Sequence, residues 1–200
     1  RGGAICTAPF FMLLENMILI HLVENAYPKQ SCFNLIKMFE TNIQIAKPGK
    51  AGDKDLDNLE MTLKIDPTSD PFGFWGLGVS ISDAFKNFLN KYKLFNTALQ
   101  KYNLDENIQL CRFEPGFNYK EYHCENDGSK EYQNRVFAWM LNLNDIEQGG
   151  ETEFIYQNFK TTPKTGNFYI WPAGSSHMHR GLVAPNEQKY FLTGWFKFLS

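Results

Sequence analysis

The stretch NFYIWPAGSSHMHRGLVAPNEQKYFLTGWFKF, from Asn167 to Phe198, decides the fold of this 200-residue chain. It contains short apolar runs, which are separated by the turn residues Pro172-Ala173-Gly174 and Ala184-Pro185-Asn186. Short runs punctuated by glycine, proline and asparagine are typical of an antiparallel sandwich or barrel. This part of the chain therefore predicts β structure made of short strands.

The same pattern extends back to Ile108, whereas the first half of the chain has a different character. We expect strands at residues 108–113, 135–143, 151–155, 167–171, 180–183 and 189–198. Before them we expect a strand at 17–24, an amphipathic helix at 30–41, and a helix at 82–102 with Ser82 as its N-cap. Loop composition at 47–58 and an irregular aromatic connector at 66–78 complete the expected order.

These elements sum to an α+β protein in which helices from the first half pack against a β core. We expect one domain over residues 17–200, with helical support at about 17–106 and the β core at about 107–198. Residues 1–16 are expected to be a disordered extension. A hydrophobic fraction of 43% and an aromatic fraction of 16% fit a globular chain of this kind.

Charge and cysteine content limit the function classes. The net charge of −2 provides no basic face, so no nucleic-acid partner is expected. The apolar segment 8–23 is interrupted by Glu15, Asn16 and His21, so neither a membrane span nor a secretory signal is expected. Because the four cysteines form no CxxC pair, we expect a reducing compartment, the cytoplasm.

Two histidine-bearing segments predict a metal site. His123 and Glu125 are two residues apart, so on a strand they point to the same face, while Cys124 between them points into the core. His179, which lies 54 residues after Glu125, is the expected third ligand. Two imidazoles and one carboxylate suit a non-haem Fe(II) that keeps positions open for substrate and dioxygen.

Lys189 follows His179 by ten residues and predicts an anchor for an acidic co-substrate. Its neighbours at 190–192 are apolar, so an inward ammonium would be costly without an anion. Thr193 is four residues further along the same expected strand and faces the same way. The rival cationic anchors are Arg135 and Arg180.

Some roles stay open between neighbouring residues. His177 could face the ion as His179 does, but the spacing to Lys189 favours His179, which leaves His177 as a residue beside the site or in a loop. Asp127 is the alternative carboxylate to Glu125. Aromatic side chains are expected to keep water from the site, and the candidates are Trp171, Phe168 and Trp139.

In this order the residues resemble the 2-oxoglutarate- and iron(II)-dependent oxygenases, specifically the prolyl 4-hydroxylase-like branch. The likeness covers about residues 108–198. Its matching segments are Arg112-Phe113-Glu114-Pro115-Gly116, Tyr119, His123-Cys124-Glu125, Leu143-Asn144-Asp145, Gly149-Gly150-Glu151-Thr152-Glu153-Phe154, Gly166, Trp171-Pro172-Ala173, His179-Arg180-Gly181, Lys189-Tyr190 and Trp195.

The resemblance implies a double-stranded β-helix core of the jelly-roll, cupin-like type. It implies His123, Glu125 and His179 as iron ligands, and Lys189 as the salt-bridge partner of the distal carboxylate of 2-oxoglutarate. The family usually has aspartate where Glu125 stands.

The family often has a tyrosine near the position of Asn142. Since that tyrosine is absent here, Tyr119 and Tyr122 are candidates for the hydrogen bonds to the co-substrate.

The implied activity is hydroxylation of an unactivated C–H bond in a peptidyl proline, with dioxygen consumed and 2-oxoglutarate decarboxylated to succinate. Ascorbate is a candidate requirement. A protein or peptide is the expected substrate, and a small molecule is the alternative. Two rival functions remain: a cupin-like enzyme that holds Zn or Mn on His123, Glu125, His177 and His179 without 2-oxoglutarate, and a non-enzymatic β-sandwich binding module.

Overall fold

The structure is a computed structural model that describes residues 18–51, 54–65, 73–99 and 101–199, so the expected extension at 1–16 lies outside the described residues. The elements in chain order are β1 (His21–Val23), α2 (Lys29–Thr41), η1 (Ile43–Ile45), β2 (Lys47–Ala51), β3 (Lys54–Lys64), α3 (Gly73–Lys91), α4 (Leu94–Ala98), β4 (Tyr102–Leu104), β5 (Asn107–Phe113), β6 (Arg135–Asn142), β7 (Thr152–Phe154), β8 (Phe159–Lys160), β9 (Phe168–Pro172), η2 (Ser175–His177), β10 (His179–Gly181) and β11 (Lys189–Phe198).

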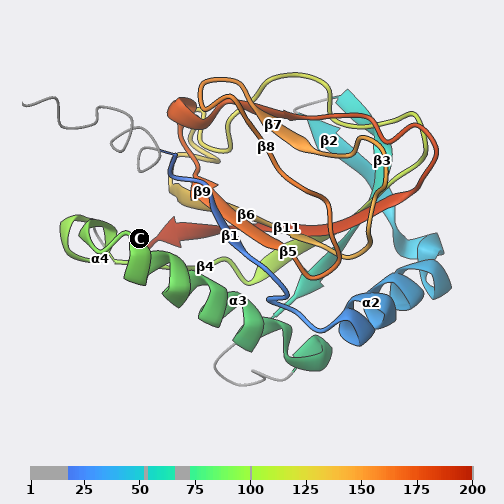
Figure 1. The fold of residues 1–200 in the computed structure, drawn as a ribbon, viewed down its shortest axis with the longest axis horizontal. Helices are drawn as coiled ribbons and strands as arrows, with labels where there is room; N and C mark the ends of the chain where they lie inside the picture. Colours follow the sequence, from blue (N-terminus) through green and yellow to red (C-terminus); the bar gives the residue numbers. More distant parts are fainter. Residues whose placement is uncertain (1–17, 52–53, 66–72, 100, 200) are drawn as a thin grey trace, which may run out of the picture.

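The strands form two antiparallel sheets. The larger has eight strands in the order β1-β9-β6-β11-β5-β3-β2, with β4 pairing to β11 outside this path. The smaller has the order β10-β7-β8. Figure 1 shows β7 and β8 above the central strands β6, β9 and β11 of the larger sheet, and α2 and α3 below those strands. The arrangement is the expected α+β architecture with helices outside a two-sheet core.

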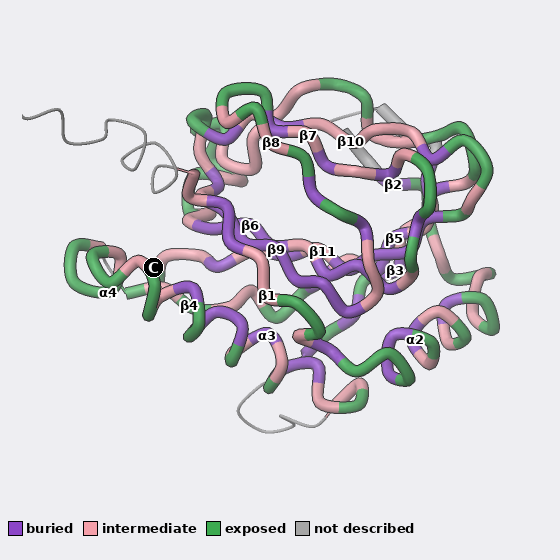
Figure 2. The backbone as a smooth tube through the Cα atoms, in the orientation of Figure 1, coloured by how far each residue is buried: buried purple, intermediate pink, exposed green. Residues whose placement is uncertain are grey.

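Strand β11 shows how alternation builds two different surfaces on the large sheet. Tyr190, Leu192 and Phe196 belong to the main hydrophobic core, which also contains buried residues of α2 and α3. Lys189 and Thr193 instead line a cavity on the opposite face. Successive side chains of a strand point to opposite faces, so one strand serves both the core and the cavity. Figure 2 shows buried positions running along the strands of the large sheet.

Helix α3 covers the outer face of the large sheet through aromatic contacts. The Phe85 ring stacks on Phe196 of β11 at a centroid distance of 3.7 Å, and Phe88 meets Phe137 of β6 edge-on at 5.1 Å. This packing explains the apolar stripe that predicted a helix here. Across the described ranges, no helix combines the length and the hydrophobicity that a bilayer crossing needs.

The strands expected in the second half of the chain are confirmed. β5, β6, β7, β9, β10 and β11 begin and end within two residues of the predicted bounds. The helix predicted at 30–41 is α2, which begins one residue earlier. The strand predicted at 17–24 is the shorter β1 in the described part of the chain.

The loop predicted at 47–58 is wrong, because residues 47–51 form β2 and residues 54–58 form the first half of β3. β2 is the last strand of the large sheet. An edge strand has one open side, and charged residues, glycine and proline are common there because they discourage pairing with another chain. Loop and edge-strand compositions therefore look alike in sequence.

The bounds of the helix predicted at 82–102 are wrong at both ends. The element α3 spans Gly73–Lys91, but Phe74, Trp75 and Gly76 have left-handed backbone, so the regular helix begins after Gly76; α4 follows separately, and Tyr102 begins β4. Ser82 lies inside α3, where its hydroxyl donates to the Gly78 carbonyl at 2.8 Å, so it is not an N-cap. Of the irregular connector expected at 66–78, residues 74–76 do have irregular, left-handed backbone, whereas residues 66–72 lie outside the described residues.

A methyl group added at Gly194 of β11 is expected to destabilise the fold. An alanine Cβ there would lie 2.6 Å from Cζ2 of the buried Trp139 ring and 3.0 Å from Ile108 Cγ2. Overpacking of this kind costs about 1–3 kcal/mol of unfolding free energy. Thermal unfolding of Gly194→Ala should show a Tm lower by roughly 2–4 °C per kcal/mol. The matched control is Gly174→Ala, whose Cβ meets nothing within 4 Å; an equal loss in both variants would contradict the packing explanation.

Candidate metal centre

A cavity of about 600 Å³ lies between the two sheets and collects most of the predicted site residues. Its walls come from β3, β5, β6, β9 and β11 of the large sheet, from β7 and β10 of the small sheet, and from the 118–127 segment. The predicted residues that line it are Tyr119, His123, Glu125, His179, Lys189 and Thr193.

Backbone pairing brings the two histidine segments together. His123 and His179 form an antiparallel bridge, in which each amide donates to the other's carbonyl at 2.9 Å. The Gly181 amide also donates to the Tyr119 carbonyl at 2.7 Å. A Cβ at Gly181 would lie 2.0 Å from Asn118 Oδ1, so the Asn118 side chain packs directly on the bare backbone of β10 at this glycine.

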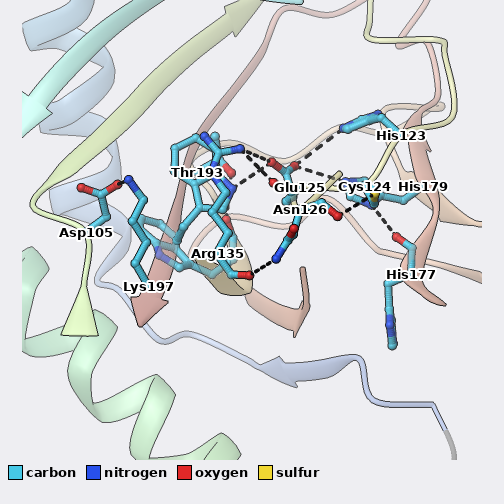
Figure 3. Close-up of polar contacts among 12 residues, drawn as sticks. Asp105, His123, Cys124, Glu125, Asn126, Arg135, His177, His179, Thr193 and Lys197 are labelled. Atoms are coloured by element: carbon cyan, nitrogen blue, oxygen red, sulfur yellow. Dashed lines mark hydrogen bonds and ion pairs between the residues drawn. The ribbon is translucent and has the colours of Figure 1, made fainter. Parts of the chain in front are cut away.

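Three ligand atoms converge at this point. One atom each from His123, Glu125 and His179 lies within 4.8 Å of the others, which is a spacing that fits a shared metal ion. Glu125 Oε1 is 3.7 Å from His123 Nε2 and 3.5 Å from His179 Nε2. Figure 3 shows the two imidazoles on the same side of the Glu125 carboxylate. Two imidazoles and a carboxylate form the donor set of non-haem Fe(II) sites with open positions.

The outer nitrogen of each imidazole is fixed by a backbone carbonyl. His123 Nδ1 lies 3.0 Å from the Glu121 carbonyl oxygen, and His179 Nδ1 lies 2.8 Å from that of His177. A carbonyl oxygen only accepts, so each Nδ1 carries a proton, and Nε2 is the nitrogen that each ring turns toward the position of a metal. Metal-binding histidines are oriented in this way as a rule.

The second carboxylate oxygen of Glu125 has its own donors. The Trp195 indole Nε1 donates to Oε2 at 2.8 Å, and Arg135 Nη1 donates to it at 3.2 Å. Burial alone would raise the pKa of the Glu125 carboxyl, but hydrogen bonds and charge from His123 and His179 hold that pKa well below its usual range. Glu125 is therefore an ionised, oriented oxygen ligand at neutral pH.

Lys189 places a positive charge deep in the same cavity. The residue is only 3% exposed, and its ammonium lies 4.9 Å from the centre of the Phe191 ring. Burial lowers the pKa of Lys189 to about 8, while the nearby Cys111 and Glu151 oppose that shift. Within the described residues no carboxylate hydrogen-bonds to it. A bound carboxylate would supply the missing counter-charge.

A match to a known family decides which chemistry this arrangement serves. The model of the 2OG-Fe(II) oxygenase superfamily matches residues 108–197, which contain all three ligand candidates and Lys189. Over these 90 residues the chain matches the 2OG-Fe(II) oxygenase superfamily. It is a 2-oxoglutarate-dependent dioxygenase, an oxidoreductase whose family uses Fe(II) and 2-oxoglutarate. The family resemblance seen in the sequence and the predicted enzyme class are confirmed.

Solved structures share the fold of this oxygenase. A viral collagen prolyl hydroxylase from Paramecium Bursaria Chlorella virus-1, in complex with 2-oxoglutarate, superposes with a TM-score of 0.70 at 18% identity, covering 92% of this chain and 98% of that chain. A prolyl 4-hydroxylase from Pseudomonas putida gives 0.66 at 15% identity, with 94% and 98% covered.

A third similar structure is a prolyl hydroxylase from Trichoplax adhaerens in complex with a hypoxia inducible factor peptide fragment. It gives a TM-score of 0.68 at 13% identity and covers 96% of this chain and 94% of that chain. At these identities the likeness establishes the fold, and it confirms the predicted double-stranded β-helix. A comparison with curated proteins found no significant match.

Several predicted residues of the oxygenase lie elsewhere than expected. Tyr122 is not among the cavity-lining residues, since its hydroxyl donates to Glu153 at 2.9 Å. Arg180 pairs with the same carboxylate at 2.8 Å and so is not the anion anchor. Cys124 is half-buried and lines the cavity, whereas alternation had predicted a core position. The segment around Cys124 is joined to β10 by a single isolated β-bridge and is not a regular strand, so its side chains need not alternate between two faces.

His177 and Asp127 are separate from the three-residue group. His177 is buried with Nδ1 2.9 Å from Ser176 Oγ, and Figure 3 shows its ring directed away from Glu125. Asp127 lines the cavity but accepts the Ser129 amide at 2.8 Å. Among the described residues, the metal-ligand group contains neither, so the four-ligand alternative has no geometric support.

The predicted aromatic shield is correct for one residue of three. Trp171 lines the cavity and meets the His179 ring edge-on at a centroid distance of 5.2 Å. Trp139 and Phe168 belong to the main core on the other face of the large sheet, where they stack at 5.4 Å. Trp195 is the second tryptophan of the cavity, although the sequence pointed to it only through the family likeness. It lies an even number of residues after Lys189 on the same strand, and this spacing could have placed it on the cavity face.

Proposed function

We propose that this oxygenase hydroxylates a proline within a peptide or protein, with dioxygen consumed and 2-oxoglutarate converted to succinate and carbon dioxide. The observation that carries the proposal is the convergence of His123, Glu125 and His179 at one end of a cavity that also contains the buried Lys189. The choice of a peptidyl proline is supported by the structural neighbours, which are prolyl hydroxylases, one of them solved with a peptide.

The three ligands and Lys189 have complementary proposed roles. His123, Glu125 and His179 would hold Fe(II) from one side and leave its remaining positions free. When bound, Fe(II) together with 2-oxoglutarate supplies the oxidising chemistry, and the protein supplies binding and orientation. Lys189 would pair with the distal carboxylate of 2-oxoglutarate, because a buried ammonium is stabilised by an anion held beside it.

Other residues of the cavity would orient the co-substrate and exclude water. Thr193 faces the cavity on the same strand as Lys189, although its hydroxyl donates to the Trp139 carbonyl at 2.9 Å. Tyr119 packs edge-on against the His123 ring at 4.3 Å and is the tyrosine proposed for a hydrogen bond to the co-substrate. Apolar walls from Trp171 and Phe191 would keep water from the reacting carbon.

The affinity for 2-oxoglutarate is expected to fall as the pH rises above about 8. The pKa of Lys189 is about 8 before the co-substrate binds, so the ammonium is present below that pH and is lost above it. Binding at higher pH then requires proton uptake, which weakens affinity up to roughly tenfold per pH unit. Calorimetric titrations from pH 7 to 9 should show this decline. In Lys189→Arg the guanidinium stays protonated, so a decline of the same size there would contradict the assignment.

The proposal is tested by a mass-spectrometric assay of proline-containing peptides with Fe(II) and 2-oxoglutarate. The expected result is a gain of one oxygen on proline together with an equimolar amount of succinate. Succinate formation without any peptide product would instead favour a small-molecule substrate. Reactions with and without ascorbate test the proposed requirement for it.

Domain organisation and location remain part of the proposal. We propose that residues 17–200 act as one oxygenase domain, with the helices of the first half supporting the β-helix core. Free cysteines at positions 32, 111 and 124 support the proposed cytoplasmic location, because a reducing compartment keeps thiols unpaired.

A further inference from the structure

The two oxygens of the Glu125 carboxylate do different things. Oε1 faces both imidazoles, at 3.7 Å from His123 Nε2 and 3.5 Å from His179 Nε2. Oε2 faces the other way and accepts from Trp195 Nε1 at 2.8 Å and from Arg135 Nη1 at 3.2 Å. In Figure 3, Arg135 lies on the opposite side of Glu125 from the two histidines.

Arg135 is held in place by contacts other than the one with the Glu125 carboxylate. Its guanidinium lies 3.6 Å from the Trp195 ring centre and 4.1 Å from that of Tyr132. The same Nη1 also donates to the Glu125 backbone carbonyl at 3.2 Å. The side chain is 13% exposed. An arginine packed against aromatic rings is a rigid donor, unlike a solvated surface cation.

The length of the glutamate gives this contact its importance. Glutamate has one more methylene than aspartate and so one more rotatable bond, which gives its carboxylate more freedom to turn both oxygens toward one metal ion. A carboxylate that chelates through both oxygens would take a position that the co-substrate or dioxygen needs. Donors that occupy Oε2 prevent this, because an oxygen that already accepts two hydrogen bonds is directed away from the ion.

We infer that Arg135 and Trp195 are positioning residues that hold Glu125 as a one-oxygen metal ligand. This inference rests on the proposed function, since it takes Glu125 as a ligand of the iron. Arg135 and Trp195 act through Glu125, and their role is separate from the anchoring of 2-oxoglutarate by Lys189. The arrangement also explains how this chain uses a glutamate where a shorter carboxylate would need less support.

The test measures Co(II) binding to the metal-free protein by calorimetry, so it does not depend on turnover. Trp195→Phe and Arg135→Met should each bind Co(II) about 10- to 100-fold more weakly than wild type, the usual effect of losing a group that orients a ligand. Their Co(II) absorption spectra should also differ from that of wild type, because a freed Oε2 raises the coordination number.

Two further variants separate positioning from a general loss of structure. Trp139→Phe makes the same chemical change in the core on the other face of the sheet, and it should bind Co(II) as wild type does. In a Glu125→Asp background the shorter carboxylate does not reach the indole, so adding Trp195→Phe should weaken binding by less than threefold, well short of its effect in wild type.

The outcomes distinguish the inference from the proposed function. If wild type binds no Co(II), the ligand set is wrong and the inference is overturned with it. If wild type binds Co(II) and both positioning variants match it, the ligand set survives and the inference alone is wrong. An equal loss in Trp139→Phe and Trp195→Phe would also overturn it, because the effect would then not depend on contact with Glu125.

Discussion

Lys189→Met is expected to weaken 2-oxoglutarate binding about 100-fold or more without unfolding the protein. The substitution removes the ammonium but keeps an apolar chain of similar length in a position that is 3% exposed. Losing one partner of a buried ion pair costs roughly 3–5 kcal/mol, and the cost falls on the complex because the distal carboxylate would be left without a counter-charge. Calorimetry with the metal-loaded protein measures the change.

The same variant should be at least as stable as wild type when no co-substrate is bound. Burial lowers the pKa of Lys189 to about 8, so the free protein carries an unfavourably buried charge that methionine removes. Lys197→Met is the matched control on the same strand, since that lysine pairs with Asp105 away from the cavity. Unchanged 2-oxoglutarate affinity in Lys189→Met, or an equal loss in Lys197→Met, would show that the anchor lies elsewhere.

His179→Ala should reduce Fe(II) affinity by more than 100-fold and abolish succinate formation. The residue is buried and its Nε2 faces Glu125 Oε1, so no solvent-exposed group can take its place. Removing a metal ligand should lower metal affinity by more than the 10- to 100-fold loss that is typical when a group that only orients a ligand is removed. Metal content after anaerobic reconstitution and a chelator-competition titration measure the effect.

Two other buried histidines provide controls for that prediction. His21 bonds to Asn87 at 2.7 Å, outside the cavity, and His21→Gln should leave Fe(II) affinity unchanged. His177→Gln keeps the backbone carbonyl that orients His179, and should change Fe(II) affinity by less than about threefold. A loss in His177→Gln as large as in His179→Ala would instead favour the four-ligand alternative.

The β core was predictable from sequence because each of its strands is short, apolar and followed by turn residues. The alternation of side chains along a strand then predicted Lys189 and Thr193 on the same face of β11, where the structure has them. The edge strand β2 was missed because of its composition. Charged residues, glycine and proline at a sheet edge have the composition of a loop, and only tertiary packing distinguishes the two.

The metal-site residues were predictable in type, but not in how they are held. His123 and Glu125 were placed on one face by strand alternation, yet their segment has only an isolated bridge to His179. The donors to Glu125 come from Arg135 and Trp195, whose contacts depend on how β6 and β11 align. Such long-range register is not encoded in any local pattern, so sequence reasoning missed both roles.

The most direct test of the account is anomalous scattering from crystals grown with Mn(II) and N-oxalylglycine, the unreactive analogue of 2-oxoglutarate. We expect one metal peak about 2.0–2.2 Å from His123 Nε2, Glu125 Oε1 and His179 Nε2, with the distal carboxylate of the analogue on Lys189. A peak outside this group, or an analogue that leaves Lys189 without a carboxylate partner, would contradict the account.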